Sequence, residues 1–247
     1  EIPAVLDKLS AKFFEKRVFD QFASFLKEYK ASHKDSKYKT LIDYYIALSG
    51  WNKLEFLAKE GMWDVYYAEK ARSLGGIIKQ LESAKDSAIG EDGYLDILYL
   101  EWLIQGDLLE GRESPALKRL EEEVKIYAVK HKDVTPLITY SKLLLDEGER
   151  QVSQRMLREY AANVSKFIPT EEAISLLREK AANALDSQDV ERAKILYDAY
   201  LTILVKSVSA EDAAFAMLDI SSFYRRKGMY GESVDVCKRL LSEFPKS

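Results

Sequence analysis

Apolar residues recur every three or four positions along most of the chain, rather than every second position. In the last part of the chain this spacing is interrupted once, at Lys227-Gly228. The apolar positions there are Phe215, Leu218, Phe223 and Tyr224 before the interruption, and Val234, Cys237, Leu240 and Leu241 after it, followed by Phe244-Pro245. A three-to-four spacing places apolar side chains on one face of an α-helix. The segment therefore predicts two helices joined by a turn.

The same pattern recurs at a spacing of 40 residues. Counting back in steps of 40 links small, large and turn residues in three segments: Ser233, Ala193 and Ser153; Cys237, Tyr197 and Leu157; Ser221, Ala181 and Ser141; Met217, Leu177 and Leu137; Gly228, Gln188 and Gly148. Similarity at a fixed period is typical of repeat proteins, in which each repeat is one supersecondary unit. We expect three helical hairpins over residues 134–247.

The period is looser upstream. Over residues 1–90 we expect a hairpin at 4–32 with a turn near Glu15–Arg17, then a loop over about 32–36, a long helix to about Glu60, a turn at Gly61 and a second helix. That helix contains Gly75-Gly76, and each glycine costs about 1 kcal/mol relative to alanine. We therefore expect a kink or a break at this pair.

Residues 91–133 predict an irregular helical hairpin. Its first helix is rich in apolar residues from Tyr94 onward, and its loop runs through Gly106 and Gly111. Ser114-Pro115 then begins the second helix, with Ser114 as the cap, because serine and proline favour helix starts.

Composition supports helices throughout. The chain of 247 residues is 47% hydrophobic, with 11 Gly and 5 Pro. Turn-forming residues are too scarce for a β-sandwich or barrel, and the apolar fraction is too high for a disordered chain. The expected fold is all-α, an α-solenoid of about six antiparallel helix-turn-helix hairpins.

The last hairpin resembles the tetratricopeptide repeat family. The likeness is carried by Tyr224, Gly228, Tyr230, Ser233, Leu240 and Pro245. A second likeness, in Phe19–Phe22, Phe25–Tyr29 and Asp35–Tyr38, is to repeats of bacterial cell-envelope proteins such as the lipoprotein of the outer-membrane β-barrel assembly machinery. The departures are Leu137, Leu177 and Met217, where the family has an aromatic residue, and Gln188 in place of a glycine.

The resemblance implies a binding groove lined by the first helix of each hairpin. By register, its candidate residues in the last three hairpins are Lys142, Arg178, Phe215, Ser222 and Arg225. The family's clamp for a terminal carboxylate needs asparagine where this chain has Ala182 and Ser222. Arg178 and Arg225 could still hold an acidic group of a peptide through paired hydrogen bonds, or they could be solvated surface arginines.

Two adjacent tyrosine pairs are further candidates for partner binding: Tyr44-Tyr45 and Tyr66-Tyr67. Neighbours on a helix differ by 100° in direction, so one member of each pair must face away from the core that the other faces. We expect the three tryptophans, Trp51, Trp63 and Trp102, to pack between neighbouring hairpins, although aromatic residues are also enriched at interface hot spots.

Catalytic and cofactor chemistry is not indicated. The chain has two histidines (His33 and His131), one cysteine (Cys237) and no phosphate-binding glycine loop, so we expect no enzyme activity, no metal and no other cofactor. A net charge of -4 argues against nucleic-acid binding. No apolar run approaches the length of a membrane span. Cys237 falls at a packed position and is expected to be an inert buried thiol.

The sequence favours a non-catalytic scaffold that binds a partner protein or peptide. The envelope likeness implies the bacterial periplasm or the periplasmic face of the outer membrane. Because the chain begins with Glu1 rather than Met, we expect that a segment such as a lipid anchor precedes it. The alternatives are a regulatory sensor that binds a peptide or small ligand and so controls a further domain outside this chain, an unrecognised helical enzyme, and a self-assembling repeat.

Overall fold

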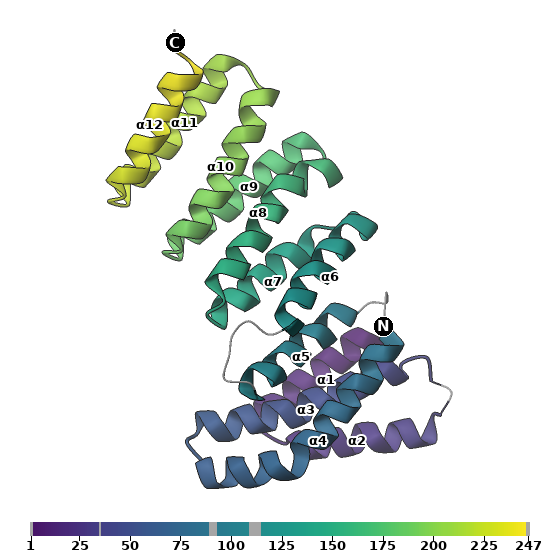
Figure 1. Cartoon of the computed structure of the whole chain (residues 1–247). Helices are drawn as coiled ribbons and strands as arrows, with labels where there is room; N and C mark the ends of the chain where they lie inside the picture. The colour runs from purple at the N-terminus through teal and green to yellow at the C-terminus, as the bar shows by residue number, and fades with distance from the viewer. Residues whose placement is uncertain (1, 35, 89–92, 109–114, 246–247) are drawn as a thin grey trace. The chain divides into compact units, whose positions relative to one another are not determined.

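The computed structural model describes residues 2–34, 36–88, 93–108 and 115–245. Over these residues the chain is all-α, with 12 helices and no strands. The helices are α1 (Ile2–Glu15), α2 (Phe19–Ser32), α3 (Lys39–Lys59), α4 (Trp63–Ala88), α5 (Tyr94–Leu108), α6 (Pro115–His131), α7 (Thr135–Asp146), α8 (Arg150–Phe167), α9 (Thr170–Asp186), α10 (Val190–Ser207), α11 (Ala210–Arg226) and α12 (Tyr230–Glu243) (Figure 1). The predicted helical class is confirmed.

The chain divides into two compact units. The first contains residues 1–123 and the second residues 124–247, and the division falls within α6.

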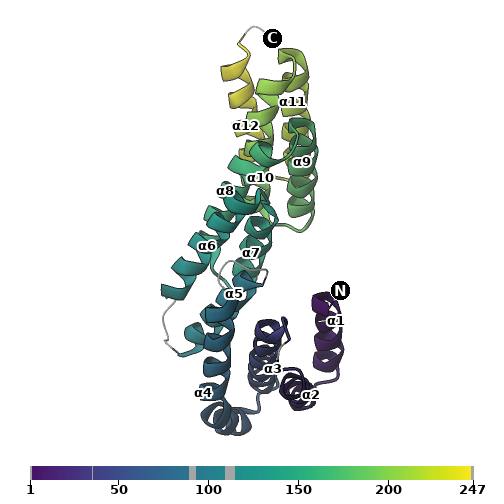
Figure 2. The same cartoon turned by 90° about the vertical axis from the view of Figure 1, so that its right-hand side faces the viewer.

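The first unit is organised around α3, which contacts α1, α2, α4 and α5. Helix α3 is buried along much of its length, and its apolar residues meet those of α1 and α2 in one core. The buried members of this core are Leu6, Phe22, Leu26, Ile42, Tyr45 and Ile46. Figure 2 shows α3 beside α2 and α4 from a second direction. One face of α3 is therefore buried in this core. The start of α3 lies near α1 and α5.

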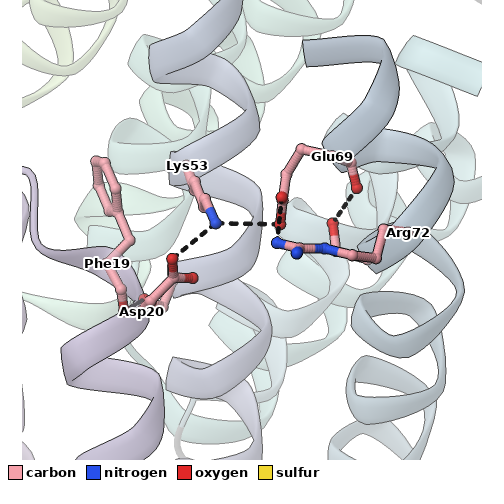
Figure 3. A network of polar contacts seen from close by, with 7 residues as sticks. Phe19, Asp20, Lys53, Glu69 and Arg72 are labelled. Carbon is pink, nitrogen blue, oxygen red and sulfur yellow. Dashed lines mark hydrogen bonds and ion pairs between the residues drawn. The ribbon is translucent and has the colours of Figure 1, made fainter. Parts of the chain in front are cut away.

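A polar network fixes α3 between α2 and α4 (Figure 3). Lys53 Nζ of α3 lies 2.7 Å from Asp20 Oδ2 of α2 and 3.1 Å from Glu69 Oε1 of α4, and Arg72 also pairs with Glu69. Burial lowers the pKa of Lys53, but its hydrogen bonds to the two carboxylates outweigh burial and raise the pKa overall. Lys53 therefore remains charged and links three helices.

Helix α4 is continuous through Gly75-Gly76, so the expected break is absent. The ribbon of α4 does change direction along its length (Figures 1 and 2).

The expected loop at Gly106 is wrong, because Gly106 lies within α5, which continues to Leu108. The apolar packing of α5 outweighs the low helix propensity of Gly106, so the helix continues past this residue. Gly111 and the expected cap Ser114 lie outside the described residues.

Replacing Gly75 or Gly76 by alanine should raise the free energy of unfolding by about 0.5–1 kcal/mol each. A Cβ atom at either position would meet nothing within 4 Å, so only the gain in helix propensity remains. Gly50→Ala is the matched control, because its Cβ would lie 2.7 Å from Ile77 Cγ1 and part of the gain would be lost in the clash. Urea denaturation followed by circular dichroism measures all three, and destabilisation by Gly75→Ala would contradict the expectation.

The second unit contains three helix pairs in chain order, α7–α8, α9–α10 and α11–α12, and the helices of each pair are in contact. The second helices begin at Arg150, Val190 and Tyr230, which are 40 residues apart. Their turns contain Gly148, Gln188 and Gly228, all with positive φ (87°, 62° and 77°). Gln188 thus adopts the left-handed conformation that glycine adopts in the other two turns, at a steric cost that glycine does not carry.

The small residues predicted to bring each pair together are all buried. In α7–α8, Ser153 Oγ donates to the Ser141 carbonyl oxygen at 2.5 Å, and in α11–α12 the Ser221 and Ser233 Oγ atoms lie 2.8 Å apart. The middle pair has Ala181 and Ala193 instead. Within each pair, the two facing small residues are either both serine or both alanine. No buried serine hydroxyl is therefore left facing an alanine without a hydrogen-bond partner.

Candidate functional site

A hollow of the first unit lies beside the tyrosines of α3. Its volume is about 860 Å³, and its lining comes from α1, α3, the last residue of α4, α5 and the residues that flank α3 and α5. The lining groups that matter for recognition are Asp7, Lys37, Tyr44, Tyr45 and Asp96. A hollow of this size falls in the range of small-ligand and peptide side-chain sites.

Tyrosine hydroxyls and carboxylates lie together in this cavity. The Tyr45 hydroxyl donates to Asp7 of α1, and the Tyr44 and Tyr45 rings contact edge-on with centroids 5.2 Å apart. Burial, together with the nearby charge of Asp96, raises the pKa of Tyr44 above its ordinary value. Burial and the hydrogen bond to Asp7 do the same for the pKa of Tyr45. Both phenols therefore remain neutral at physiological pH, as hydrogen-bonding groups on an apolar ring.

Raising the pH above 10 should destabilise the first unit, and Tyr45→Phe should reduce that loss. The folded-state pKa of Tyr45 lies above the unfolded value of about 10. The stabilisation is therefore fully present below pH 10 and is lost as the pH rises through the folded-state pKa. Urea denaturation at several pH values between about 8 and 11 measures the slope. Tyr67→Phe serves as the control, and equal slopes for Tyr45→Phe and wild type would contradict this assignment.

The second tyrosine pair lies on the first turns of α4. Tyr66 is buried, whereas Tyr67 is 63% exposed. Trp63 is 53% exposed and its ring lies 6.4 Å from that of Tyr67, so the prediction that all three tryptophans are packed is wrong for Trp63. Trp51 and Trp102 are buried. The sequence pattern did not predict the exposure of Trp63, because Trp63 is the first residue of its helix and the helix periodicity does not yet assign it to a face. Of the four candidate tyrosines, only Tyr67 is exposed, while Tyr44 is half-buried.

The groove candidates of the second unit lie on the solvent side of the first helices. Lys142, Arg178 and Arg225 are exposed and Ser222 is half-buried. Phe215 and its neighbour Leu218 are 60% and 46% exposed, although both are large and apolar. The opposite sides of the same helices carry the fully buried positions Leu137, Leu177 and Met217. The candidates therefore lie on one side of their helices, away from the buried positions.

Lys142 lines a hollow of about 680 Å³ between α7 and α9. Its polar lining includes Lys180, Asn183 and Arg192, with Asp146 and Asp189 as the acidic members. Burial lowers the pKa of Arg192, and Asp189 and Asp146 oppose that effect. Asn183, one residue after Ala182, is the amide side chain in the lining of this hollow. Asn183 was not among the residues predicted from the sequence, because the 40-residue register compares equivalent positions and Asn183 lies one residue beyond the position that it compares.

The remaining chemistry-bearing residues do not converge. Among the described residues no group of three or more His, Cys, Asp and Glu side chains could hold a metal ion. Cys237 is half-buried rather than buried, and its Sγ lies 3.1 Å from Ser221 Oγ. No helix in the described ranges combines the length and apolar character needed to cross a membrane.

Comparison of the chain with protein-family models, with curated proteins and with solved structures finds no match in any of the three.

Proposed function

We propose that this protein is a non-catalytic scaffold that binds a partner protein or peptide through the exposed faces of its first helices. In this proposal the helices form an α-solenoid of about six tetratricopeptide-like hairpins, because each hairpin buries one face against the next and leaves a continuous face for binding. The 40-residue recurrence of turns and buried positions in α7 to α12 supports this arrangement.

The observation that carries the proposal is the exposure of Phe215 and Leu218 on α11, the helix that also carries Arg225. Two large apolar side chains, 60% and 46% exposed, lie within one turn of each other on α11, and Arg225 follows on the exposed part of that helix. Aromatic residues and arginine are the residue types most enriched where partners bind. Such a surface fits a peptide with an apolar anchor and a carboxylate.

The proposed cellular setting comes from the envelope likeness of residues 19–38. On that likeness, the scaffold belongs to a multi-protein assembly at the periplasmic face of a bacterial outer membrane. The partner proposed is a protein, and nucleic acid is not proposed because of the net charge of -4.

Replacing Arg178 and Arg225 together by alanine is expected to weaken binding of the partner protein by about tenfold or more. Each arginine can form paired hydrogen bonds with a carboxylate, and both are exposed, so helix content should not change. Calorimetry measures the affinity, and circular dichroism checks the helices. Replacing the exposed Arg158 of α8 by alanine is the control. Unchanged affinity in the double variant would remove the arginines from the binding face.

A regulatory sensor is the second candidate, and the cavity beside Tyr44 favours it. A hollow of about 860 Å³ with neutral phenols and carboxylates could take a peptide side chain or a small cationic ligand. Tyr44→Ala should abolish binding of such a ligand without weakening the partner held at α11. Loss of both activities in this variant would argue against two separate sites.

A further inference from the structure

A second hollow of the first unit is lined by four lysines. It lies between α2, α3 and α4, has a volume of about 540 Å³, and is lined by Lys27, Lys30, Lys34 and Lys39 together with Ile46 and Gln80. No acidic side chain belongs to its described lining. The concentration of like charge around one hollow is unfavourable unless counter-charges enter it.

One of the four lysines is already neutralised. Lys30 Nζ pairs with Asp43, which is 2% exposed and also accepts a hydrogen bond from Gln80. Asp43 is therefore satisfied from within the protein and fixes Lys30 and Gln80 at the wall of the hollow. It leaves the charges of the other lysines uncompensated.

Lys27, Lys34 and Lys39 form no ion pair with a carboxylate among the described residues, and each is exposed. Lys27 lies one helical turn before Lys30 on α2, Lys34 follows the end of α2, and Lys39 is the first residue of α3. Three ammonium groups, from α2, from the segment that follows it and from α3, thus border one hollow, and the partial positive charge at the start of α3 adds to them.

We propose that this hollow binds a phosphate-bearing ligand, with the phosphate held by Lys27, Lys34 and Lys39. Ammonium groups bind phosphate as point charges, and three of them can neutralise a dianion with charge to spare. The hollow falls in the size range of organic ligands, so the phosphate has an organic remainder that contacts Ile46 and the lysine stems. The same chemistry is presented by a free phosphate compound and by a lipid headgroup.

Two probes distinguish these sources. Calorimetry with pyrophosphate tests a free compound, and flotation with phosphatidylcholine vesicles that contain phosphatidic acid, compared with pure phosphatidylcholine, tests a headgroup. Both are carried out with the full chain at about 0.15 M salt, where long-range surface attraction is screened. Binding of either probe is expected, and binding of neither would overturn the proposal.

The variant K27A/K34A/K39A should weaken the binding by about tenfold or more. K8A/K12A/K16A is the matched control, because it removes three exposed lysines, two of α1 and one directly after it, that do not line the hollow and lowers the net charge equally. Lys30 is left in place because Asp43 depends on it. Equal weakening by both variants would mean that only net charge matters, and it would overturn the site.

Acetylation of lysines gives a readout in the unaltered protein. Bound pyrophosphate or vesicle should slow the modification of Lys27, Lys34 and Lys39 and leave that of Lys8, Lys12 and Lys16 unchanged. Uniform protection of all six, or of none, would contradict the assignment.

Discussion

Replacing Lys30 by methionine is expected to lower the free energy of unfolding by about 3 kcal/mol, since removing one partner of a buried ion pair leaves an uncompensated charge. Asp43 is 2% exposed and depends on Lys30 for its counter-charge, while Gln80 contributes one neutral hydrogen bond. Methionine retains the apolar stem of lysine, so the loss is mainly that of the cation. Urea denaturation followed by circular dichroism measures the change.

Two controls separate the buried pair from a general effect of charge. Lys59→Met breaks an exposed pair with Glu55 at 3.7 Å and should change stability by about 0.5 kcal/mol or less. The double variant Lys30→Met/Asp43→Asn should be more stable than Lys30→Met alone, because the stranded charge is removed. A double variant less stable than the single one would contradict the role given to Asp43.

Leu177→Ala should cost about 3 kcal/mol in the second unit. Leu177 is fully buried in α9, as are Leu137 and Met217 at the equivalent positions of α7 and α11. Truncation loses the transfer free energy of the side chain and leaves a cavity in a packed interior. Chemical denaturation measures the loss, and similar losses are expected for Leu137→Ala and Met217→Ala.

The control for this series is Leu241→Ala, at a leucine that is 70% exposed on α12. It should change stability by about 0.5 kcal/mol or less, because little apolar surface returns to water. If Leu177→Ala cost no more than Leu241→Ala, the 40-residue register would not describe the core.

Much of the helical structure was predictable because helix periodicity and turn residues are local signals. Gly61, Gly148 and Gly228 all adopt positive φ at the turns where they were expected, and the 40-residue count identified Gln188 as their equivalent. The buried small pairs were also visible in the sequence, since close helix contact requires small residues on both helices. Gly106 was misassigned because propensity alone does not outweigh the packing of an apolar helix.

The sites were harder to predict because they join distant segments. The cavity of the first unit brings Asp7, Tyr44 and Asp96 together from three helices. The hollow lined by four lysines brings Gln80 of α4 together with residues of α2 and α3. Single-sequence periodicity assigns a residue to a face of its own helix and carries no information on which helix lies opposite. Tyr44 was therefore identified as a candidate, whereas its carboxylate neighbours were not.

Site-specific photo-crosslinking from α11 tests the central claim most directly. A photoreactive phenylalanine analogue at position 215 of the full chain, in cells of the source organism, should crosslink to one partner protein at stoichiometric yield. The same analogue at the exposed position 241 of α12 is the control and should not capture that protein. Crosslinking of the same proteins from both positions, or of none from position 215, would contradict a scaffold that binds through the exposed faces of its first helices.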